Sequence, residues 1–275
     1  MTDPIFKMNN LHISNLCSDS INSKKFLNIV SKFKNIKGLD IAPLNISKDW
    51  ESSEKDCKKF YNFIKKKNLR VNAVQGIFYK KNFSLLNDFI KNDNEIITHF
   101  KRIIRLCKIL HCNKIIFGSS EFRNRDEHTI KYTNIIFKRF IKKIILLLEK
   151  NNIIFCIETI PMIYNSNYLY KFSQTCKIVR SFKNKFIKIN FDSGIFFKSK
   201  LSKNYFINNL DLINNVQISE PYFNFFTNPS KYNERFIKIL KNQCYAGSVS
   251  LEIISRRLEI NKINKSINNF TKLFN

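Results

Sequence analysis

Four side chains whose oxygen atoms suit metal binding or proton transfer follow short apolar runs in this 275-residue chain. Glu158, Asp192 and Glu252 each come directly after such a run, and Gln217 lies near the end of another. Successive members of the set are about 25 to 35 residues apart, which is the length of one strand, one helix and their connections. The spacing predicts that each side chain stands at the end of a separate strand.

These residue types point to proton transfer beside a bound divalent cation. A reaction that removes a proton next to a carbonyl forms an enediolate, which a divalent metal can stabilise as a Lewis acid. Two carboxylates on opposite sides of the substrate can act as acid and base. We predict that Glu158 and Glu252 form this catalytic pair and that both hold the metal together with Asp192. The alternative is that the carboxylates only end strands and bind lysines or backbone amides.

Short apolar runs alternate with longer amphipathic stretches along the whole chain, a pattern typical of βα units and a parallel sheet. The predicted strands are 11–16, 38–42, 70–74, 114–117, 153–157, 186–191, 212–218 and 247–251. The predicted helices are 22–33, 51–66, 95–110, 127–149, 167–181, a weak one near Tyr205, 234–240 and 260–273.

Eight such units predict an α/β fold of the (β/α)₈ TIM barrel type. A barrel of this kind typically needs about 250 residues, so a single domain would occupy residues 1–275. A doubly wound open sheet has the same alternation of elements. It would not bring four consecutive strand ends around one point, whereas barrel enzymes carry their chemistry at the C-terminal ends of the strands. The barrel is therefore the preferred prediction.

The strand-end segments resemble the xylose isomerase-like superfamily, specifically its sugar-phosphate isomerase/epimerase branch. They read Ile-Glu-Thr at 157–159, Phe-Asp-Ser-Gly at 191–194, Val-Gln-Ile-Ser-Glu-Pro at 216–221 and Val-Ser-Leu-Glu at 249–252. Segments 13–16, 38–43, 73–76 and 116–125 are similar to the first four strands of that family and the loops after them. The resemblance implies one divalent metal bound at the ends of strands five to eight, and it supports an isomerase or epimerase.

The family pattern has Glu, Asp, His and Glu at the four metal positions, and this chain has Gln217 in place of the histidine. A Gln amide can still bind a metal through its oxygen. With three carboxylates it would make an all-oxygen site, which favours Mg or Mn, while Co or Zn remain possible. The alternative is that Gln217 only hydrogen-bonds a ligand carboxylate or a metal-bound water.

Four further residues are predicted to contact the substrate. Gln75 ends the third strand, and Glu220 follows the seventh. Arg123 and Arg125 lie in the loop after the fourth strand, in a chain that has few arginines and mostly uses lysine. Guanidinium groups bind phosphate or carboxylate through two parallel hydrogen bonds, so these arginines predict an anion anchor. For each residue the alternative is a local structural contact: a hydrogen bond of the side-chain amide for Gln75, an ion pair with a lysine for Glu220 and surface ion pairs for the arginines.

The formal net charge is +27, from 48 basic and 21 acidic residues, which raises the possibility of a nucleic-acid partner. The lysines are dispersed, however, and the chain has only 5 Gly and 5 Pro beside abundant Lys, Asn, Ile and Phe. A genomic bias toward A/T-rich codons produces this composition without a polyanionic partner. We therefore expect a small-molecule sugar or sugar phosphate as partner and consider nucleic acid unlikely.

Two other functions stay open. An apurinic-site endonuclease of the same superfamily would suit the charge, but the resemblance then requires a trinuclear zinc site rich in histidines, and only His12 stands near a predicted strand end. A barrel that has lost catalysis and serves in binding is the second. The seven cysteines lack C-x-x-C spacing and are expected to be reduced thiols in a cytoplasmic protein. No apolar run reaches the ~18 residues of a membrane span.

Overall fold

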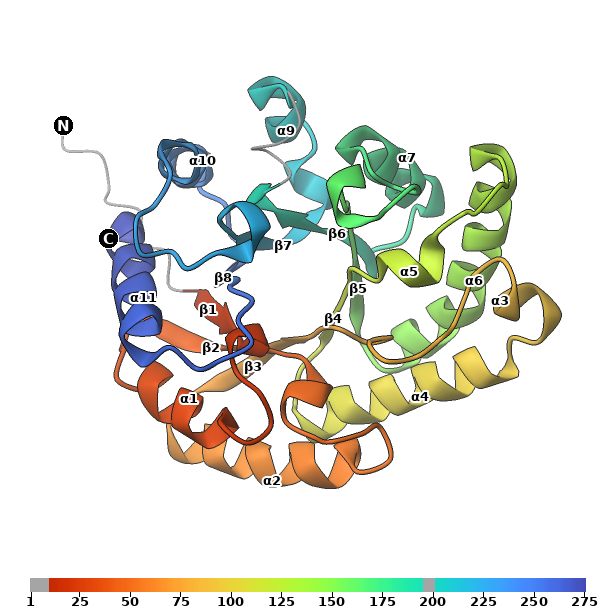
Figure 1. Ribbon diagram of the computed structural model, residues 1–275. Helices are drawn as coiled ribbons and strands as arrows, with labels where there is room; N and C mark the ends of the chain where they lie inside the picture. The colour runs from red at the N-terminus through yellow and green to blue at the C-terminus, as the bar shows by residue number, and fades with distance from the viewer. Residues whose placement is uncertain (1–9, 195–200) are drawn as a thin grey trace.

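The computed structural model describes residues 10–194 and 201–275, and their eight parallel strands close into one barrel (Figure 1). Each strand pairs with its neighbours in the chain, and β1 pairs with β8. This confirms the (β/α)₈ barrel and all eight predicted strands. The strands are β1 Leu11–Ser14, β2 Ile36–Ile41, β3 Arg70–Val74, β4 Lys114–Phe117, β5 Ile154–Glu158, β6 Ile187–Asp192, β7 Ile213–Ile218 and β8 Ser248–Leu251.

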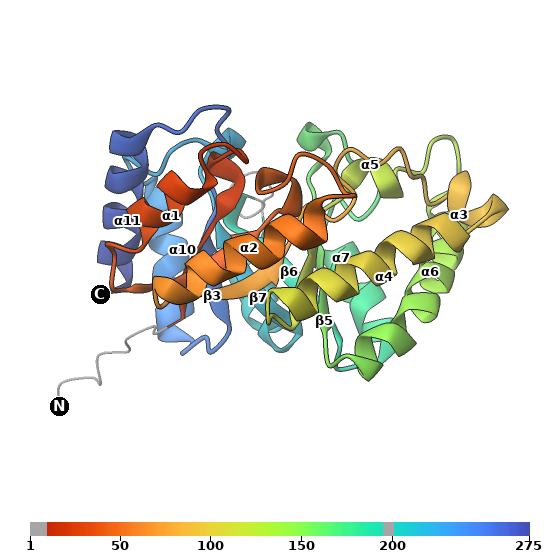
Figure 2. The same ribbon diagram turned by 90° about the horizontal axis from the view of Figure 1, so that it is seen from below.

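The longer helices surround the strands, and α1, α2 and α4 cross the outside of the barrel side by side (Figure 2). Their apolar stripes face the strands; in α4, Ile96, Phe100 and Ile103 are buried as their three- and four-residue spacing predicts. The helices are α1 Ser23–Val30, α2 Ser53–Lys66, α3 Asp88–Lys91, α4 Asn94–Ile109, α5 Ser120–Arg123, α6 Ile130–Lys150, α7 Phe172–Phe182, α9 Lys203–Ile207, α10 Lys231–Asn242 and α11 Ile260–Phe274.

Three stretches differ from the sequence prediction. The helix expected at 167–181 begins only at Phe172, because Tyr168 and Leu169 are buried in an irregular loop in which Leu169 has a φ of 54°. The short helices α3 and α5 stand in loops for which no helix was predicted. Each has four residues, which is too few for a helical period to be seen in the sequence.

The space inside the barrel is divided between apolar and polar side chains. Ala73, Ile116 and Cys156 form a small apolar cluster, while Asn190 and Asn215 are fully buried amides on β6 and β7. Bulky branched residues more often fill the interior of such barrels. A buried polar interior has to be hydrogen-bonded throughout, since each unpaired group is costly. The aromatic core lies instead between strands and helices, where Phe117 and Phe155 stack at 5.1 Å.

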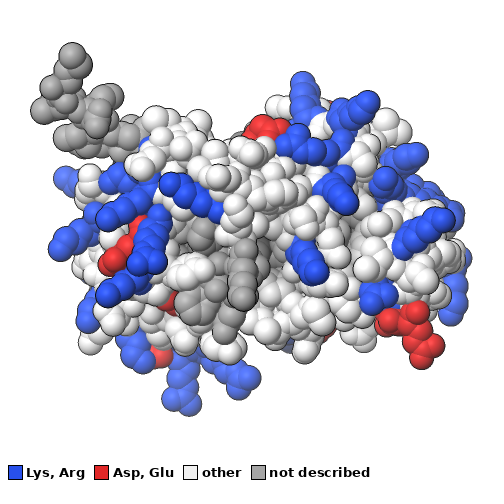
Figure 3. Space-filling view, turned by 90° about the horizontal axis from the view of Figure 1, so that it is seen from above, with Lys and Arg blue, Asp and Glu red and all other residues white. Residues whose placement is uncertain are grey.

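The surface charge, the cysteines and the helices of the described residues bear on the remaining sequence expectations. Basic side chains are spread over the face seen in Figure 3, with uncharged surface between the groups. The seven cysteines are all free thiols. In the described part of the chain, none of the helices combines the length and the apolar character needed to cross a membrane.

Candidate functional site

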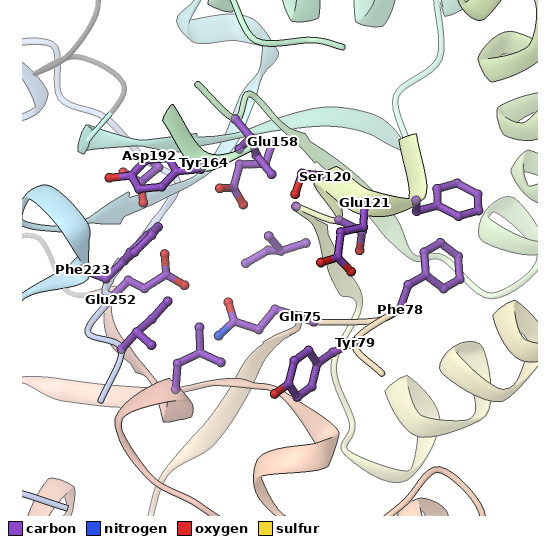
Figure 4. A pocket seen from close by; sticks show the side chains of 18 of the residues that line it. Gln75, Phe78, Tyr79, Ser120, Glu121, Glu158, Tyr164, Asp192, Phe223 and Glu252 are labelled. Atoms are coloured by element: carbon purple, nitrogen blue, oxygen red, sulfur yellow. The ribbon is translucent and has the colours of Figure 1, made fainter. Parts of the chain in front are cut away.

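A cavity of about 500 Å³ opens at the C-terminal ends of the strands. The carboxylates Glu158, Asp192 and Glu252 line it together with Gln75. Figure 4 shows the side chains of Glu158, Glu252 and Gln75 directed toward the same open space, with Asp192 beside them. Loop residues complete the wall, among them Leu16, Phe78, Tyr79, Ser119, Tyr164, Phe223 and Ile254.

Glu158 ends β5, and its carboxylate lies close to the backbone of β4. Its Oε2 atom accepts a hydrogen bond from Asn190 Nδ2 at 3.1 Å. A Cβ atom on Gly118 would stand only 2.7 Å from Oε2, so glycine leaves the space that this carboxylate occupies. Burial raises the pKa of Glu158 to about 8; the charge of Asp192 adds to this rise, and the charge of Arg123 opposes it.

Asp192, the last residue of β6, is held through one oxygen only. Its Oδ1 accepts hydrogen bonds from Gly194 N at 2.5 Å and from Ser219 Oγ at 2.7 Å. Its buried Oδ2 has no hydrogen-bond partner among the described residues. Burial raises the pKa of Asp192, while the two hydrogen bonds and a contact with the Glu252 carboxyl act in the opposite direction. A buried carboxylate oxygen without a partner is costly unless a cation or a donor binds it.

Glu252 follows β8 and is tied to the neighbouring strand by Gln217. The Nε2 atom of Gln217 donates to Glu252 Oε1 at 2.9 Å and to Gln75 Oε1 at 2.9 Å. Burial is the main cause that raises the pKa of Glu252 well above its usual range, and the charges of Asp192 and Glu158 add to it. Three carboxylates thus repel one another in one buried place, where a divalent cation would neutralise two of the charges.

The chemistry of these residues fits a divalent cation, because carboxylate oxygens are its preferred ligands and one of them lacks a partner. The positions of these side chains, however, do not yet form an ion site. Within residues 10–194 and 201–275, no three His, Cys, Asp or Glu side chains are arranged around a common point that could hold an ion. Ion binding would therefore require a side-chain rotation, and the metal ligands predicted from the sequence stay a prediction.

Of the predicted substrate contacts, Gln75 alone lines the cavity. Its Nε2 donates to Ser14 Oγ at 2.6 Å, so the amide also joins β1 to β3. Arg123 is fully buried, its guanidinium has no hydrogen-bond partner among the described residues, and it lies 5.6 Å from the centre of the Phe117 ring. Arg125 donates to the backbone oxygens of Asn167 and His128. Neither arginine is among the residues that line the cavity: Arg123 lies in the core, and Arg125 is bound to the backbone of neighbouring loops.

Glu220 also lies away from the cavity wall. Its Oε1 accepts hydrogen bonds from Ser230 N at 2.9 Å and from Asn233 Nδ2 at 3.0 Å. These bonds fasten the loop after β7 to the start of α10. In place of the lysine that the sequence offers as an alternative partner, Glu220 binds a backbone amide and a side-chain amide.

Several cavity residues escaped the sequence reasoning. Lys80, Lys81 and Glu121 line the cavity from loops that carry no periodic pattern. Asn190, which the sequence predicts only as part of a strand, contacts Glu158. Its position carried a signal, since residues two apart on a strand point to the same face and Asn190 precedes Asp192 by two.

The histidines make contacts elsewhere and do not line the cavity. His12 bonds Asn10 at 2.8 Å, and His99 bonds the Ile77 carbonyl at 2.7 Å. The rings of His111 and His128 lie against Tyr61 and Tyr132.

The sequence profile of the xylose isomerase-like TIM barrel family matches residues 36–273. The chain belongs to this family. A curated relative of the xylose isomerase-like chain, an uncharacterised protein of Buchnera aphidicola subsp. Acyrthosiphon pisum (strain APS), is 26% identical over 182 residues, which cover 62% of this chain and 18% of the relative. The chain thus spans about a fifth of the length of that protein.

Solved structures share the xylose isomerase-like fold over nearly the whole chain. The 3-keto-D-glucoside 4-epimerase of E. coli has a TM-score of 0.75 and 12% identity, with 97% of this chain and 99% of that chain covered. The IolI protein with a bound zinc atom has a TM-score of 0.73 and 15% identity, with 96% and 98% covered. A family 2 AP endonuclease of Brucella melitensis has a TM-score of 0.74 and 12% identity, with 96% and 99% covered. At these identities the likeness establishes the fold alone.

Proposed function

We propose that this chain is a divalent-metal-dependent sugar or sugar-phosphate isomerase or epimerase that works through an enediolate. The observation that carries the proposal is the convergence of three carboxylates from the ends of β5, β6 and β8 on one cavity. The volume of about 500 Å³ lies in the range usual for small-molecule sites. The family and the epimerases among its structural relatives support the same reaction class.

Glu158 and Glu252 are the proposed acid–base pair. Burial raises the pKa of both carboxyl groups, and the pKa of Glu158, about 8, is close enough to neutral pH for this group to take up and release a proton. One carboxylate takes the proton from the carbon next to the carbonyl. The other returns a proton to the same carbon from the opposite face in an epimerisation, or to the former carbonyl carbon in an isomerisation. In each case one proton leaves carbon and one proton returns to carbon; in an isomerisation the hydroxyl proton of the first carbon also passes to the former carbonyl oxygen.

Asp192 is proposed to hold the cation through the oxygen that has no partner, while Gly194 and Ser219 fix the other oxygen. When bound, the metal would supply Lewis-acid stabilisation of the negative charge on the enediolate. Mg or Mn is favoured by the carboxylate ligands, with Co or Zn possible. A phosphate group on the sugar would be attracted by Lys80 and Lys81 at the cavity wall.

An apurinic-site endonuclease is the second candidate, and the net charge of +27 favours it. The contacts of the four histidines, away from the cavity, argue against the histidine-rich zinc site that it would need. A non-catalytic binding barrel is the third, because Gln217 departs from the family pattern.

Elemental analysis combined with solvent exchange tests the proposal. The protein, purified in turn with Mg, Mn, Co or Zn, is mixed in D₂O with a panel of ketoses and ketose phosphates. We expect about one metal ion per chain and deuterium at one carbon of at least one sugar. Metal-free protein without exchange on any sugar would contradict the proposal. Cleavage of abasic-site DNA would support the nuclease, and sugar binding without exchange would support the binding barrel.

A further inference from the structure

A row of buried amides connects the lower barrel interior to the floor of the cavity. Asn190 and Asn215 are paired across β6 and β7, and Asp192 and Gln217 are paired two residues further on. Asn215 Nδ2 donates to Asn190 Oδ1 at 2.7 Å. Asn190 Nδ2 donates to Gln217 Oε1 at 2.5 Å and to Glu158 Oε2 at 3.1 Å. The three amides are fully buried, so their hydrogen bonds do not compete with bulk water.

The direction in which the amides donate along the row is not fixed by their shape, since the oxygen and the nitrogen of each amide could exchange places. One end of the row must therefore be held by a group that fixes which atom faces it. Lys114 supplies that end. Burial lowers the pKa of Lys114, but its side-chain nitrogen carries N–H donors whether or not it is charged. Nζ lies 3.4 Å from Asn215 Oδ1. Asn72 Nδ2, at 3.1 Å, and Ser248 Oγ, at 2.8 Å, contact the same oxygen. The oxygen of Asn215 therefore faces these donors, and its NH₂ group faces Asn190.

The direction then passes from one amide to the next. Asn190 must present its oxygen to the NH₂ of Asn215, which turns its own NH₂ toward Glu158 and Gln217. Gln217 in turn presents its oxygen to Asn190, and its NH₂ faces Glu252 and Gln75. The oxygen of Gln217 is the only atom of this side chain that could bind a metal; it accepts from Asn190, on the side away from Glu252, and Gln217 is not among the residues that line the cavity.

We propose that Lys114, Asn215 and Asn190 orient Gln217 as a hydrogen-bond donor to Glu252, so that Gln217 positions a metal ligand and is not itself a ligand. This inference rests on the proposed metal site. It assigns Asn190 a second positioning role, because the same NH₂ group holds Glu158. The site is then a three-carboxylate site in which a buried amide network replaces the imidazole.

Asn215→Asp provides the sharpest test, because it replaces the donor NH₂ by an acceptor and leaves shape and volume nearly unchanged. The new carboxylate cannot donate to Asn190, so Asn190 has to turn over and presents an oxygen to Glu158. Asn214→Asp is the matched control: it makes the same chemical change on the adjacent residue of β7, whose half-buried side chain takes no part in the hydrogen bonds of the amide row.

Mn²⁺ titration by calorimetry gives the first readout. We expect Asn215→Asp to bind Mn²⁺ about 10-fold more weakly than wild type, or weaker still, as for other residues that orient metal ligands. Asn214→Asp is expected to stay within about twofold of wild type, since it lies outside the network. Equal affinities of the two variants would overturn the inference.

Counting the waters on bound Mn²⁺ by electron spin echo in D₂O gives the second readout. Gln217→Leu should leave the number of waters unchanged, although it weakens binding, because Gln217 is not a ligand. A gain of one water in this variant would overturn the inference.

A third readout needs no metal and separates this inference from the proposed function. In metal-free protein, the Asn190 NH₂ protons should show a nuclear Overhauser effect to the Glu158 methylene protons, retained in Asn214→Asp and lost in Asn215→Asp. Absence of the effect in wild type would overturn the relay. If the effect is present and wild type binds no Mn²⁺, the proposed function fails while the relay stands.

Discussion

The side-chain nitrogen of Gln217 lies 2.9 Å from Glu252 Oε1, so the residue in the family's histidine position donates to the neighbouring carboxylate. The same nitrogen donates to Gln75, and Gln75 donates to Ser14. One continuous set of hydrogen bonds thus connects β8, β7, β3 and β1 at the floor of the cavity. Such buried networks hold side chains in a single arrangement when every member is satisfied.

Gly118 gives the first prediction. Gly118→Ala should lower turnover about 10-fold or more, because the new Cβ would stand 2.7 Å from Glu158 Oε2 and displace that carboxylate; small misplacements of catalytic groups can cost about 10²-fold. Steady-state kinetics with the sugar found by the exchange screen measures the effect, and a denaturant melt checks that the fold is intact. Wild-type turnover in a folded variant would mean that Glu158 is not held against β4 as described.

Arg123 gives a prediction about stability. Arg123→Met removes a fully buried guanidinium that has no hydrogen-bond partner among the described residues and keeps a similar volume. Burying a charge costs free energy unless the charge is paired and hydrogen-bonded, and an apolar side chain of similar volume avoids that cost. Urea unfolding should therefore show an unchanged or higher free energy of unfolding. A loss above about 1 kcal/mol would indicate that the guanidinium is bound by a group that stabilises it.

Glu220 separates a structural role from a substrate role. Glu220→Ala removes the acceptor of Ser230 N and Asn233 Nδ2, so we expect a loss of about 1–3 kcal/mol in the free energy of unfolding. The KM of the sugar should stay near the wild-type value, since Glu220 does not line the cavity. A raised KM with unchanged stability would restore the contact with substrate hydroxyls that the sequence predicted.

His99 predicts how stability depends on pH. Burial lowers the pKa of His99 to about 4, although the hydrogen bond to the Ile77 carbonyl opposes this. The unfolded chain therefore binds a proton near pH 6.5 that the folded protein refuses, so stability is full above pH 6.5 and falls as pH drops toward 4. His99→Gln keeps a donor for Ile77 and does not titrate. The difference between wild type and variant should shift by about 3 kcal/mol from pH 7 to 4; a constant difference would contradict the assignment.

The barrel and the strand-end carboxylates could be predicted because both depend on local patterns. Strands such as Lys114–Phe117 are apolar runs bounded by breaks, and the residues directly after them must lie at one mouth once the barrel closes. The places of Arg123 and Arg125 could not be predicted in this way. Both follow β4 within a few residues, but loop conformation turns one into the core and the other onto the backbone of Asn167.

The amide row shows a second limit. Asn190 and Asn215 share the inward face with Asp192 and Gln217 by simple alternation, so their burial inside the barrel follows from the sequence. The direction of their hydrogen bonds does not, because it depends on Lys114, which is about 100 residues away from Asn215 in the chain and reaches it only in the closed barrel.

Deuterium transfer from solvent tests the central claim most directly. With the metal-loaded protein and the sugar found by the screen, mass spectrometry follows deuterium incorporation in wild type, Glu158→Gln, Glu252→Gln and the control Glu95→Gln, whose side chain is exposed on α4. We predict a loss of about 10²-fold or more in each of the first two variants, as expected for positioned acid–base groups, and a wild-type rate in the control. Wild-type rates in both Glu158→Gln and Glu252→Gln would contradict the proposed proton transfer.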